Sequence, residues 1–581
     1  MQRKRLMTIF VLSGLATQAL ATDLEFSPVE APVTDAAKRQ VIASATALIA
    51  GQPMPLGFTL LARTGDVIGV GTYGQIVDQA GGPLHEAGSF EGVPNRADYA
   101  SLLPVGGKVF SVSHTESRPG ALYLTTLDQD AAGRLSATST RPIDLSAVGG
   151  LWNPCAGSVT PWNTHLGSEE GPSDARNFET ATSLKDLKAE AAMAAYFGID
   201  AATTTVDAVR TAVNPYRYGH VVEVAVTGNG EAQVAKRLAM GRMSVELATL
   251  MPDGKTAYIT DDTTNGGLFR FVADTPGDLS SGRLFAAKWL QTSAENGGAA
   301  MLEWVDLGHA DDEAINAGIQ AGAVFSSLFE TADMVAGGKC PDGFAPSHAE
   351  TRAECLKVRT GMEALASRLE SRRFAAMKGA TTEFHKFEGS AVDPAQHVLY
   401  IAASTVSAGM EDNSFEDFGG ANDIRLPQNS CGAVYAMTLD ENWVGTRIEA
   451  AISGQTTAYG AESPFSGQTC AIDGIANPDN LAFIAGAQTL IVAEDTIKGH
   501  QNDAIWAYRP ADKTLTRILT TPYGAEATAV SWQPDVNGHG YLSVVVQHPY
   551  GESDQALSND LSDTRAYFGY MGPFPVIKQT P

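Results

Sequence analysis

Residues 245–262 read VELATLMPDGKTAYITDD, two short apolar segments on either side of a Pro-Asp-Gly-Lys turn. Apolar segments joined by such a turn predict a β-hairpin, in which the second strand runs back beside the first. The start of the first strand and the end of the second then lie on the same edge. Glu246 and Asp261 occupy these two points and are therefore expected to lie close together.

The same pattern recurs along the chain, with the two ends of each hairpin 15 positions apart. One copy is NPCAGSVTPWNTHLGSEE at residues 153–170, and two more are EGSAVDPAQHVLYIAAS and DNLAFIAGAQTLIVAED. Because each hairpin returns to its starting edge, the groups at these ends are candidates for one shared site. They are Cys155 and Glu170, Glu246 and Asp261, Asp479 and Glu494, and Glu388 with Ala403 in place of a second acid.

Further strands follow each hairpin, and six copies of the unit can be recognised. Strand units of this size cannot bury both faces alone, and their repetition is typical of a β-propeller. A β-sandwich or a β-solenoid is the alternative, although long and uneven repeats disfavour the solenoid. We predict an all-β fold, a six-bladed β-propeller whose first strands line the channel. The blades begin near Asp98, Cys155, Glu246, Glu388, Asp479 and Glu526.

Two stretches, at about 173–214 and 311–380, have the spacing and composition of helices instead. They interrupt the second and third units. We expect helical insertions that form a lid near the channel mouth, with peripheral decoration as the alternative. Residues 22–581 are then a single propeller domain.

The first 21 residues are expected to be a signal peptide. They combine the basic run Arg3-Lys4-Arg5, an apolar segment from residue 6 to 15 and the small-x-small pattern at 19–21. The apolar segment is shorter than the roughly 20 residues that a membrane span needs. The sequence therefore predicts export, to the periplasm or out of the cell.

The composition fits a globular protein that attracts cations. With 44% hydrophobic and 18% charged residues, the chain can bury a large core. Its formal net charge of −26 repels nucleic acid and anionic lipid and attracts divalent cations. Calcium, which prefers several oxygen ligands, fits this surface, and no nucleic acid partner is expected.

The chain has five cysteines, and export makes disulfides plausible. One pairing joins Cys340 to Cys355 and Cys431 to Cys470, which leaves Cys155 alone. An unpaired thiol is either buried packing or a metal ligand. The carboxylates near Cys155 in the sequence favour the metal ligand.

In this order, the segments CAGSVTPWNTHLGSEE, GRMSVELATLMPDGKTAYITDD, KFEGSAVDP, PDNLAF and AEATAVSWQPD resemble those of the PhoX-type alkaline phosphatases. The resemblance implies a six-bladed propeller that hydrolyses phosphomonoesters with a cluster of Fe³⁺ and Ca²⁺ ions at the channel mouth. It implies a thiolate ligand to iron at Cys155 and an iron-bridging carboxylate at Glu246. It also implies further ligands at Glu170, Glu388 and Asp479. The hairpin argument adds neighbouring candidates for the metal site: Glu169, Asp261, Asp262, Glu494, Asp495 and Glu526.

The chain departs from the family pattern in the fourth hairpin. Lys386 stands where the family has an arginine, and Phe387 where it has a proline. Lysine binds phosphate as a point charge, without the bidentate fork of arginine. His385 and Lys386 adjoin Glu388 and are our candidates for anion contact and catalysis. His165 is open to three interpretations: a phosphate contact, a proton donor or packing.

The leading prediction is an exported, metal-dependent phosphomonoesterase that acts as a monomer on small phosphorylated substrates. One alternative is a calcium-dependent propeller esterase or lactonase, which would need neither Cys155 nor iron. Another is a non-catalytic exported binding protein that is stabilised by calcium. A serine hydrolase is disfavoured, because Ser158 is not in a G-x-S-x-G motif.

Overall fold

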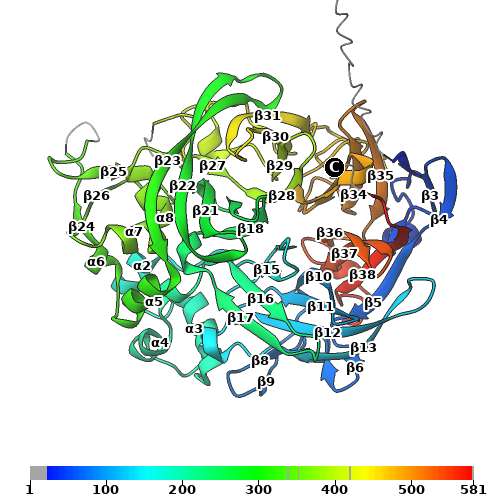
Figure 1. The fold of residues 1–581 in the computed structure, drawn as a ribbon, viewed down its shortest axis with the longest axis horizontal. Helices are drawn as coiled ribbons and strands as arrows, with labels where there is room; N and C mark the ends of the chain where they lie inside the picture. The colour runs from blue at the N-terminus through cyan, green and yellow to red at the C-terminus, as the bar shows by residue number, and fades with distance from the viewer. Residues whose placement is uncertain (1–21, 336–338, 351, 418–420, 579–581) are drawn as a thin grey trace, which may run out of the picture.

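The predicted hairpins form, and further strands extend them outward into antiparallel sheets (Figure 1). The computed structural model describes residues 22–335, 339–350, 352–417 and 421–578, so the predicted signal peptide lies outside the described residues. The sheets surround a central channel, and the first strand of each contacts the first strands of its two neighbours. This confirms the predicted six-bladed β-propeller.

Four strands of each blade follow one another from the channel outward, and β2 (Ile42–Ala43) adds a fifth at the outer edge of blade 5. Blades 1 to 3 are β10 (Ala97–Val105), β11 (Lys108–Thr115), β12 (Ala121–Gln129), β13 (Leu135–Pro142); β14 (Gly157–Val159), β15 (His165–Gly167), β16 (Val222–Val226), β17 (Ala232–Lys236); and β18 (Val245–Leu250), β19 (Thr256–Asp261), β21 (Leu268–Thr275), β22 (Asp278–Ser293). Blades 4 to 6 are β28 (Phe387–Asp393), β29 (Val398–Ala403), β30 (Ala433–Leu439), β31 (Gly445–Ser453); β32 (Pro478–Ile484), β33 (Thr489–Glu494), β34 (Ala504–Arg509), β35 (Thr514–Thr520); and β36 (Glu526–Val536), β37 (His539–Gln547), β38 (Tyr567–Pro575), β5 (Phe58–Arg63).

Two connections tie the blades together. Strand β23 (Ala299–Asp311) pairs with β22 and then with β31, so blades 3 and 4 share one nine-stranded sheet. The ring is closed by β5, which comes from the N-terminal part of the chain and pairs with the last strand, β38. Blade 6 is thus built from both ends of the chain.

Each blade interface holds a cluster of buried apolar side chains in the described part of the chain. Side chains alternate between the two faces of a strand, so a blade with apolar residues on both faces packs against both neighbours. Tyr99 and Val545, for example, share the cluster between blades 1 and 6, and Tyr400 and Val492 that between blades 4 and 5. The ring therefore positions the channel mouth through packing on all sides.

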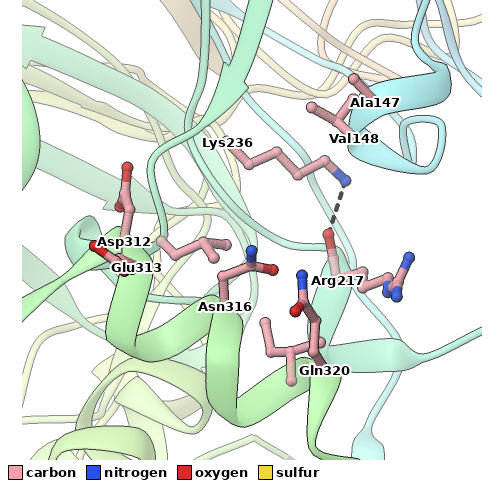
Figure 2. A pocket seen from close by; sticks show the side chains of 10 residues that line it. Ala147, Val148, Arg217, Lys236, Asp312, Glu313, Asn316 and Gln320 are labelled. Atoms are coloured by element: carbon pink, nitrogen blue, oxygen red, sulfur yellow. Dashed lines mark hydrogen bonds between the residues drawn. The ribbon is translucent and has the colours of Figure 1, made fainter.

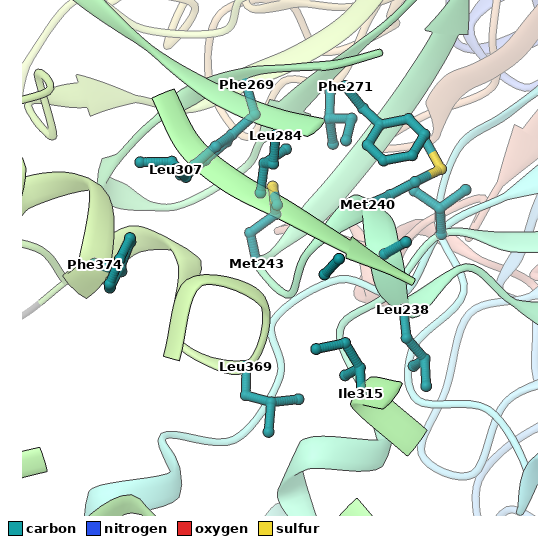
Figure 3. Close-up of a cluster of buried hydrophobic side chains, with 14 of the residues drawn as sticks. Leu238, Met240, Met243, Phe269, Phe271, Leu284, Leu307, Ile315, Leu369 and Phe374 are labelled. Carbon is teal, nitrogen blue, oxygen red and sulfur yellow. The ribbon is translucent and has the colours of Figure 1, made fainter. Parts of the chain in front are cut away.

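Both predicted insertions contain helices, which Figure 1 places beside the ring next to blades 2 and 3. The second insertion also has a small sheet of β24 (Phe329–Ala332), β25 (Ala345–Ser347) and β26 (Glu354–Val358). Figure 3 shows Ile315, Leu369 and Phe374 from this insertion in one cluster with core residues of the blades. The helices are α2 (Ala175–Thr180), α3 (Lys188–Ala194), α4 (Val206–Ala212), α5 (Asp312–Gln320), α6 (Phe325–Leu328), α7 (Glu363–Leu369) and α8 (Ser371–Met377).

Disulfides join Cys340 to Cys355 and Cys431 to Cys470, and Cys155 is a free thiol. This is the pairing considered from the sequence. Among the described residues, no helix has the length and apolar character needed to cross a membrane.

Candidate metal centre

In blades 1 to 5, one backbone hydrogen bond recurs at the channel mouth. A residue shortly after the second strand donates its N–H to a carbonyl shortly before the first strand; it follows the second strand directly in four blades and three residues later in blade 2. These donors, which we call the second row, are Glu116, Glu170, Asp262, Ser404 and Asp495. The residue two positions after each acceptor carbonyl forms the inner row: Asp98, Cys155, Glu246, Glu388 and Asp479.

A register shift explains why the inner row faces the channel. In blade 3, Val245 pairs with Asp261 but Ala248 pairs with Ile259, so the first strand has an extra residue directly after Val245. The same shift occurs in blades 1, 4 and 5. Such a β-bulge interrupts the pairing and changes the direction of a side chain. It lies at Glu246 in blade 3, and at the corresponding acids of the other three blades.

The two rows bring metal-ligand atoms together in two groups. The ligand atoms of Glu116, Cys155 and Glu170 lie within 4.8 Å of one another. A second group with the same spacing consists of Glu246, Asp262 and Glu388. The Sγ atom of Cys155 also lies 3.6 Å from Oδ2 of Asp98. The structure therefore gathers residues from blades 1 to 4 at one mouth of the channel.

The second row is also held in place by amide side chains. Nδ2 of Asn153 lies 2.8 Å from Oε1 of Glu116 and 3.0 Å from Oε2 of Glu170. Nε2 of Gln547, from blade 6, lies 2.8 Å from Oδ2 of Asp98 and 3.1 Å from Oε2 of Glu116. Asn153 thus links the second-row acids of blades 1 and 2, and Gln547 links blade 6 to the acids of blade 1.

The inner row carries negative charge that the protein alone does not neutralise. Burial, followed by repulsion from Asp479 and Glu388, raises the pKa of Glu246 well above its usual range. Burial and Asp262 raise the pKa of Glu388 to about 7. The Oε1 atom of Glu246 is buried and has no hydrogen-bond partner. Buried carboxylates that repel one another and keep an unpaired oxygen fit a site for cations.

In blades 2, 3 and 5, the residue before the second-row acid is also an acid, and its carboxylate accepts hydrogen bonds from within the protein. Glu169 accepts hydrogen bonds from the backbone N–H groups of Trp152, Gly219 and His220, and from Nζ of Lys236 at 2.8 Å. Consecutive residues of an extended chain point to opposite sides, so Glu169 faces the protein where Glu170 faces the mouth.

Asp261 and Glu494 are placed like Glu169. Asp261 accepts from the N–H groups of Ser244 and Gly267, both at 2.9 Å. Glu494 accepts from two N–H groups, the Trp506 indole and His500. These three carboxylates thus brace the loops behind the second row.

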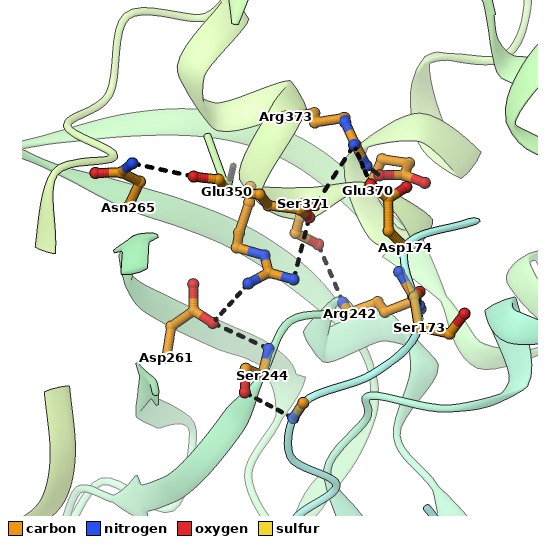
Figure 4. A network of polar contacts seen from close by, with 12 residues as sticks. Ser173, Asp174, Arg242, Ser244, Asp261, Asn265, Glu350, Glu370, Ser371 and Arg373 are labelled. Carbon is orange, nitrogen blue, oxygen red and sulfur yellow. Dashed lines mark hydrogen bonds and ion pairs between the residues drawn. The ribbon is translucent and has the colours of Figure 1, made fainter. Parts of the chain in front are cut away.

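The second insertion reaches this layer, and Figure 4 shows Glu350, Ser371 and Arg373 of the insertion near Asp261. Arg372 of α8 lies 3.7 Å from Asp261 and 3.1 Å from Glu350. The neighbouring Arg373 is fully buried and pairs with Glu354 at 2.7 Å and Glu370 at 2.8 Å. The insertion is therefore connected through ion pairs to the hairpin that carries Asp262.

Lys386 lies between the two rows. Its Nζ atom is 2.8 Å from Oδ2 of Asp262 and 3.0 Å from Oε1 of Glu388. Burial disfavours its charge, but Asp262 and Glu388 outweigh this and raise the pKa of Lys386 above its usual value. Burial and Lys386 lower the pKa of His385, whose Nδ1 atom lies 3.2 Å from Oγ1 of Thr264. Both predicted anion contacts thus lie at the rim of the acid cluster.

Blade 6 does not repeat the arrangement. Its register shift begins after Thr528, so Glu526 lies two residues before the last regular pair. In blades 1, 3, 4 and 5, the acid is the first residue after that pair. Glu526 is buried, with Oε2 3.3 Å from Nε2 of His548. Burial, Asp495 and Asp98 raise its pKa well above the usual range, so it still belongs to the charged cluster.

His165 is packed behind the site. It is fully buried, and its Nε2 atom lies 2.8 Å from Nε2 of His114. His114 in turn bonds the carbonyl of Cys155 through Nδ1. Of the three interpretations of His165, this geometry supports packing.

Sequence reasoning missed Asp98 and Glu116 as members of the cluster, as well as Gln547. Asp98 was recognised only as a blade start. Ala97 pairs with Thr115 whereas Val245 pairs with Asp261, so the first hairpin is two residues longer and the constant spacing passes over Glu116. Its place at the end of that hairpin was the signal that could have found it.

Among the cavities that lie away from the acids, two are lined in part by blade 2. One of about 550 Å³ lies in the channel, lined by first-strand residues such as Leu247, Phe483 and Trp532. The other, of about 410 Å³, lies between α5 and blade 2 (Figure 2). There Nζ of Lys236 donates to the carbonyl of Arg217 at 2.7 Å, besides its ion pair with Glu169.

A thiol and a ring of carboxylates at the mouth of a propeller are typical of a metal-binding protein. Comparison with known proteins identifies the family. The model of the alkaline phosphatase PhoX family matches residues 115–550, so the chain belongs to that family. It is a phosphatase of the PhoX type.

Among solved structures, PhoX of Pseudomonas fluorescens in complex with vanadate, a transition state analogue, is similar with a TM-score of 0.61 and 18% identity. The match covers 96% of this chain and 100% of that one. A putative 6-phosphogluconolactonase of Bacteroides uniformis matches with a TM-score of only 0.30 and 11% identity, over 83% and 97% of the two chains. No curated protein sequence matches significantly.

Proposed function

We propose that this PhoX-type phosphatase is an exported phosphomonoesterase whose two rows of ligands hold iron and calcium. The observation that carries the proposal is the unpartnered, buried oxygen of Glu246 in a cluster that also contains a free thiol. A soft thiolate beside hard carboxylates suits iron, and the remaining oxygen ligands suit calcium.

The geometry supports a separate role for each group of residues. Cys155, Glu116 and Glu170 would hold one part of the cluster, and Glu246 with Glu388 another. Bound cations would supply Lewis-acid neutralisation of the phosphate oxygens, where charge develops in the transition state. Asp98 and Asp479 belong to the inner row with Cys155, Glu246 and Glu388, and they would add carboxylate ligands on the side of blades 1 and 5.

Among the remaining acids, Asp262 and Asp495 face the mouth with Glu526, whereas Glu169, Asp261 and Glu494 keep the loops in place. Cations held by Asp262 and Glu388 would take over the oxygens that Lys386 contacts. The ammonium group of Lys386 would then be free to bind a phosphate oxygen at the rim, with His385 beside it.

Metal content and activity test this proposal together. The purified mature protein should contain iron and calcium by elemental analysis, and should hydrolyse p-nitrophenyl phosphate at alkaline pH in the presence of Ca²⁺. Chelation should remove the activity, and Cys155→Ala should lose iron first. Calcium without iron, together with cleavage of carboxylic esters only, would instead identify the calcium-dependent esterase.

Export is part of the proposal and has its own support. The two disulfides fit an oxidising compartment, as does the basic and apolar start of the sequence. Sequencing the N-terminus of the secreted protein should find Thr22 first. The protein is proposed to act as a monomer.

A further inference from the structure

Arg118 lies next to the chain segments that carry Glu116 and Glu170, the second-row acids of blades 1 and 2. It follows Glu116 by two positions. It also stands beside Gly171, which follows Glu170: a Cβ atom at Gly171 would come within 3.1 Å of Nη2 of Arg118. The guanidinium thus occupies space that is open because residue 171 is a glycine.

The surrounding backbone fixes this position. The N–H of Asn153 donates to the carbonyl of Ser117 at 2.9 Å, so the loop that carries Arg118 runs along the segment leading to Cys155. The guanidinium lies 5.4 Å from the ring centroid of Trp152, within the range of a cation–π contact. Trp152 is itself anchored, because its indole N–H donates to the carbonyl of Gly171 at 2.9 Å.

Despite this setting, Arg118 makes no ion pair with the described residues. Its Nε atom is buried and has no hydrogen-bond partner. Lys386, by contrast, pairs with two carboxylates of the cluster. An arginine that leaves its donors unused beside acids is available for an anion from solution.

We propose that Arg118 binds the phosphate group of the substrate. It would supply the bidentate fork that Lys386, a point charge, cannot offer in place of the family's arginine. Arg118 lies beside Gly171, the residue after Glu170, and Lys386 is close enough to Glu170 to influence it by its charge. The inference rests on the proposed function, since it assumes a phosphomonoester at this mouth.

The test is competitive inhibition of p-nitrophenyl phosphate hydrolysis by inorganic phosphate, measured with the metal content of the same sample. Arg118→Ala should raise Ki for phosphate and lower kcat/KM by 10-fold to 100-fold, which is about 1.4 to 2.7 kcal/mol. Iron and calcium should stay at wild-type levels. Arg118→Lys should raise Ki at least about threefold, and the exposed Arg134→Ala is the matched control with no change.

An unchanged Ki in Arg118→Ala, or a loss of metal that parallels the loss of affinity, would overturn the assignment. If Arg118→Ala does not fold, Arg118→Lys decides by the same two readings. A wild type that neither hydrolyses phosphomonoesters nor binds phosphate would remove the proposed function, and this inference with it. An active wild type with an indifferent Arg118→Ala would remove only the inference.

Discussion

Glu494 and Asp495 are adjacent acids with opposite roles, and a matched pair of substitutions separates them. We expect Glu494→Gln to destabilise the metal-free protein, and Asp495→Asn to leave it as stable as the wild type or slightly more stable. Each change replaces one carboxylate oxygen by an NH₂ group in the same place. The two variants therefore differ in environment and hardly in size.

The magnitude follows from the hydrogen bonds. Oε1 of Glu494 accepts from the N–H of Ala476 at 2.8 Å and from the indole of Trp506 at 2.6 Å. Oε2 accepts from the N–H of Ala504 and from Nδ1 of His500, both at 2.9 Å. If Oε1 becomes NH₂, two buried donors lose their acceptor, which costs about 2–6 kcal/mol at about 1–3 kcal/mol each. If Oε2 becomes NH₂, the N–H of Ala504 loses its acceptor while Nδ1 of His500 can accept from the new group, so the cost is about 1–3 kcal/mol.

Asp495 instead faces Asp479, Asp98 and Glu526, and its charge helps to raise the pKa of each of these acids. Removing that charge relieves repulsion, so stability in a chelator is maintained while calcium binding weakens. Urea and thermal denaturation of chelator-treated proteins measure the first effect, and elemental analysis the second. Equal destabilisation by both variants, or a stable Glu494→Gln, would refute the division between bracing and ligand acids.

Three further predictions concern single positions. Glu246→Gln should abolish phosphatase activity and lower metal content, because a neutral amide cannot bridge ions. The metal-free variant should unfold no earlier than the metal-free wild type, and a variant that keeps its metal would contradict the prediction. Lys386→Arg should raise activity toward p-nitrophenyl phosphate and Lys386→Ala should lower it, each on the order of 10-fold for ~1.4 kcal/mol; equal rates in all three proteins would speak against a phosphate contact. Burial, and then Asp423, raise the pKa of Glu383 from 4.5 to about 7, so the folded protein binds this proton more tightly and its stability falls as pH rises from 4.5 to 7. Glu383→Gln should therefore be more stable than the wild type by up to about 3 kcal/mol at pH 8. Denaturation curves should show this difference at pH 8 and none at pH 4.

Much of the fold could be predicted because hairpins leave a regular spacing in the sequence. The turn after Leu250 and the apolar strands around it identify blade 3, and the same reasoning places the starts of the other blades. The closure of blade 6 by residues 58–63 was not predicted, since the pairing of β5 with β38 joins segments some 500 residues apart and leaves no local signal.

The site was predicted in outline and less well in detail. The 15-residue spacing selected Glu170, Asp261 and Glu494, but of these only Glu170 faces the mouth. In the other two blades the next residue, Asp262 or Asp495, does so instead. That choice depends on donors such as the Trp506 indole, which reach the acid from distant parts of the chain. Glu116 escaped because its hairpin is longer, and the place of Arg118 depends on packing against Trp152.

The closure of blade 6 also sets when the centre can first exist. Gln547 and Asp98 meet across a separation of 449 residues, where β10 of blade 1 contacts β36 and β37 of blade 6. Contacts of such long range form late, after the loop between them has closed. A chain still emerging during synthesis therefore lacks Gln547 and this side of the acid ring, which is complete only when the first and last blades have met.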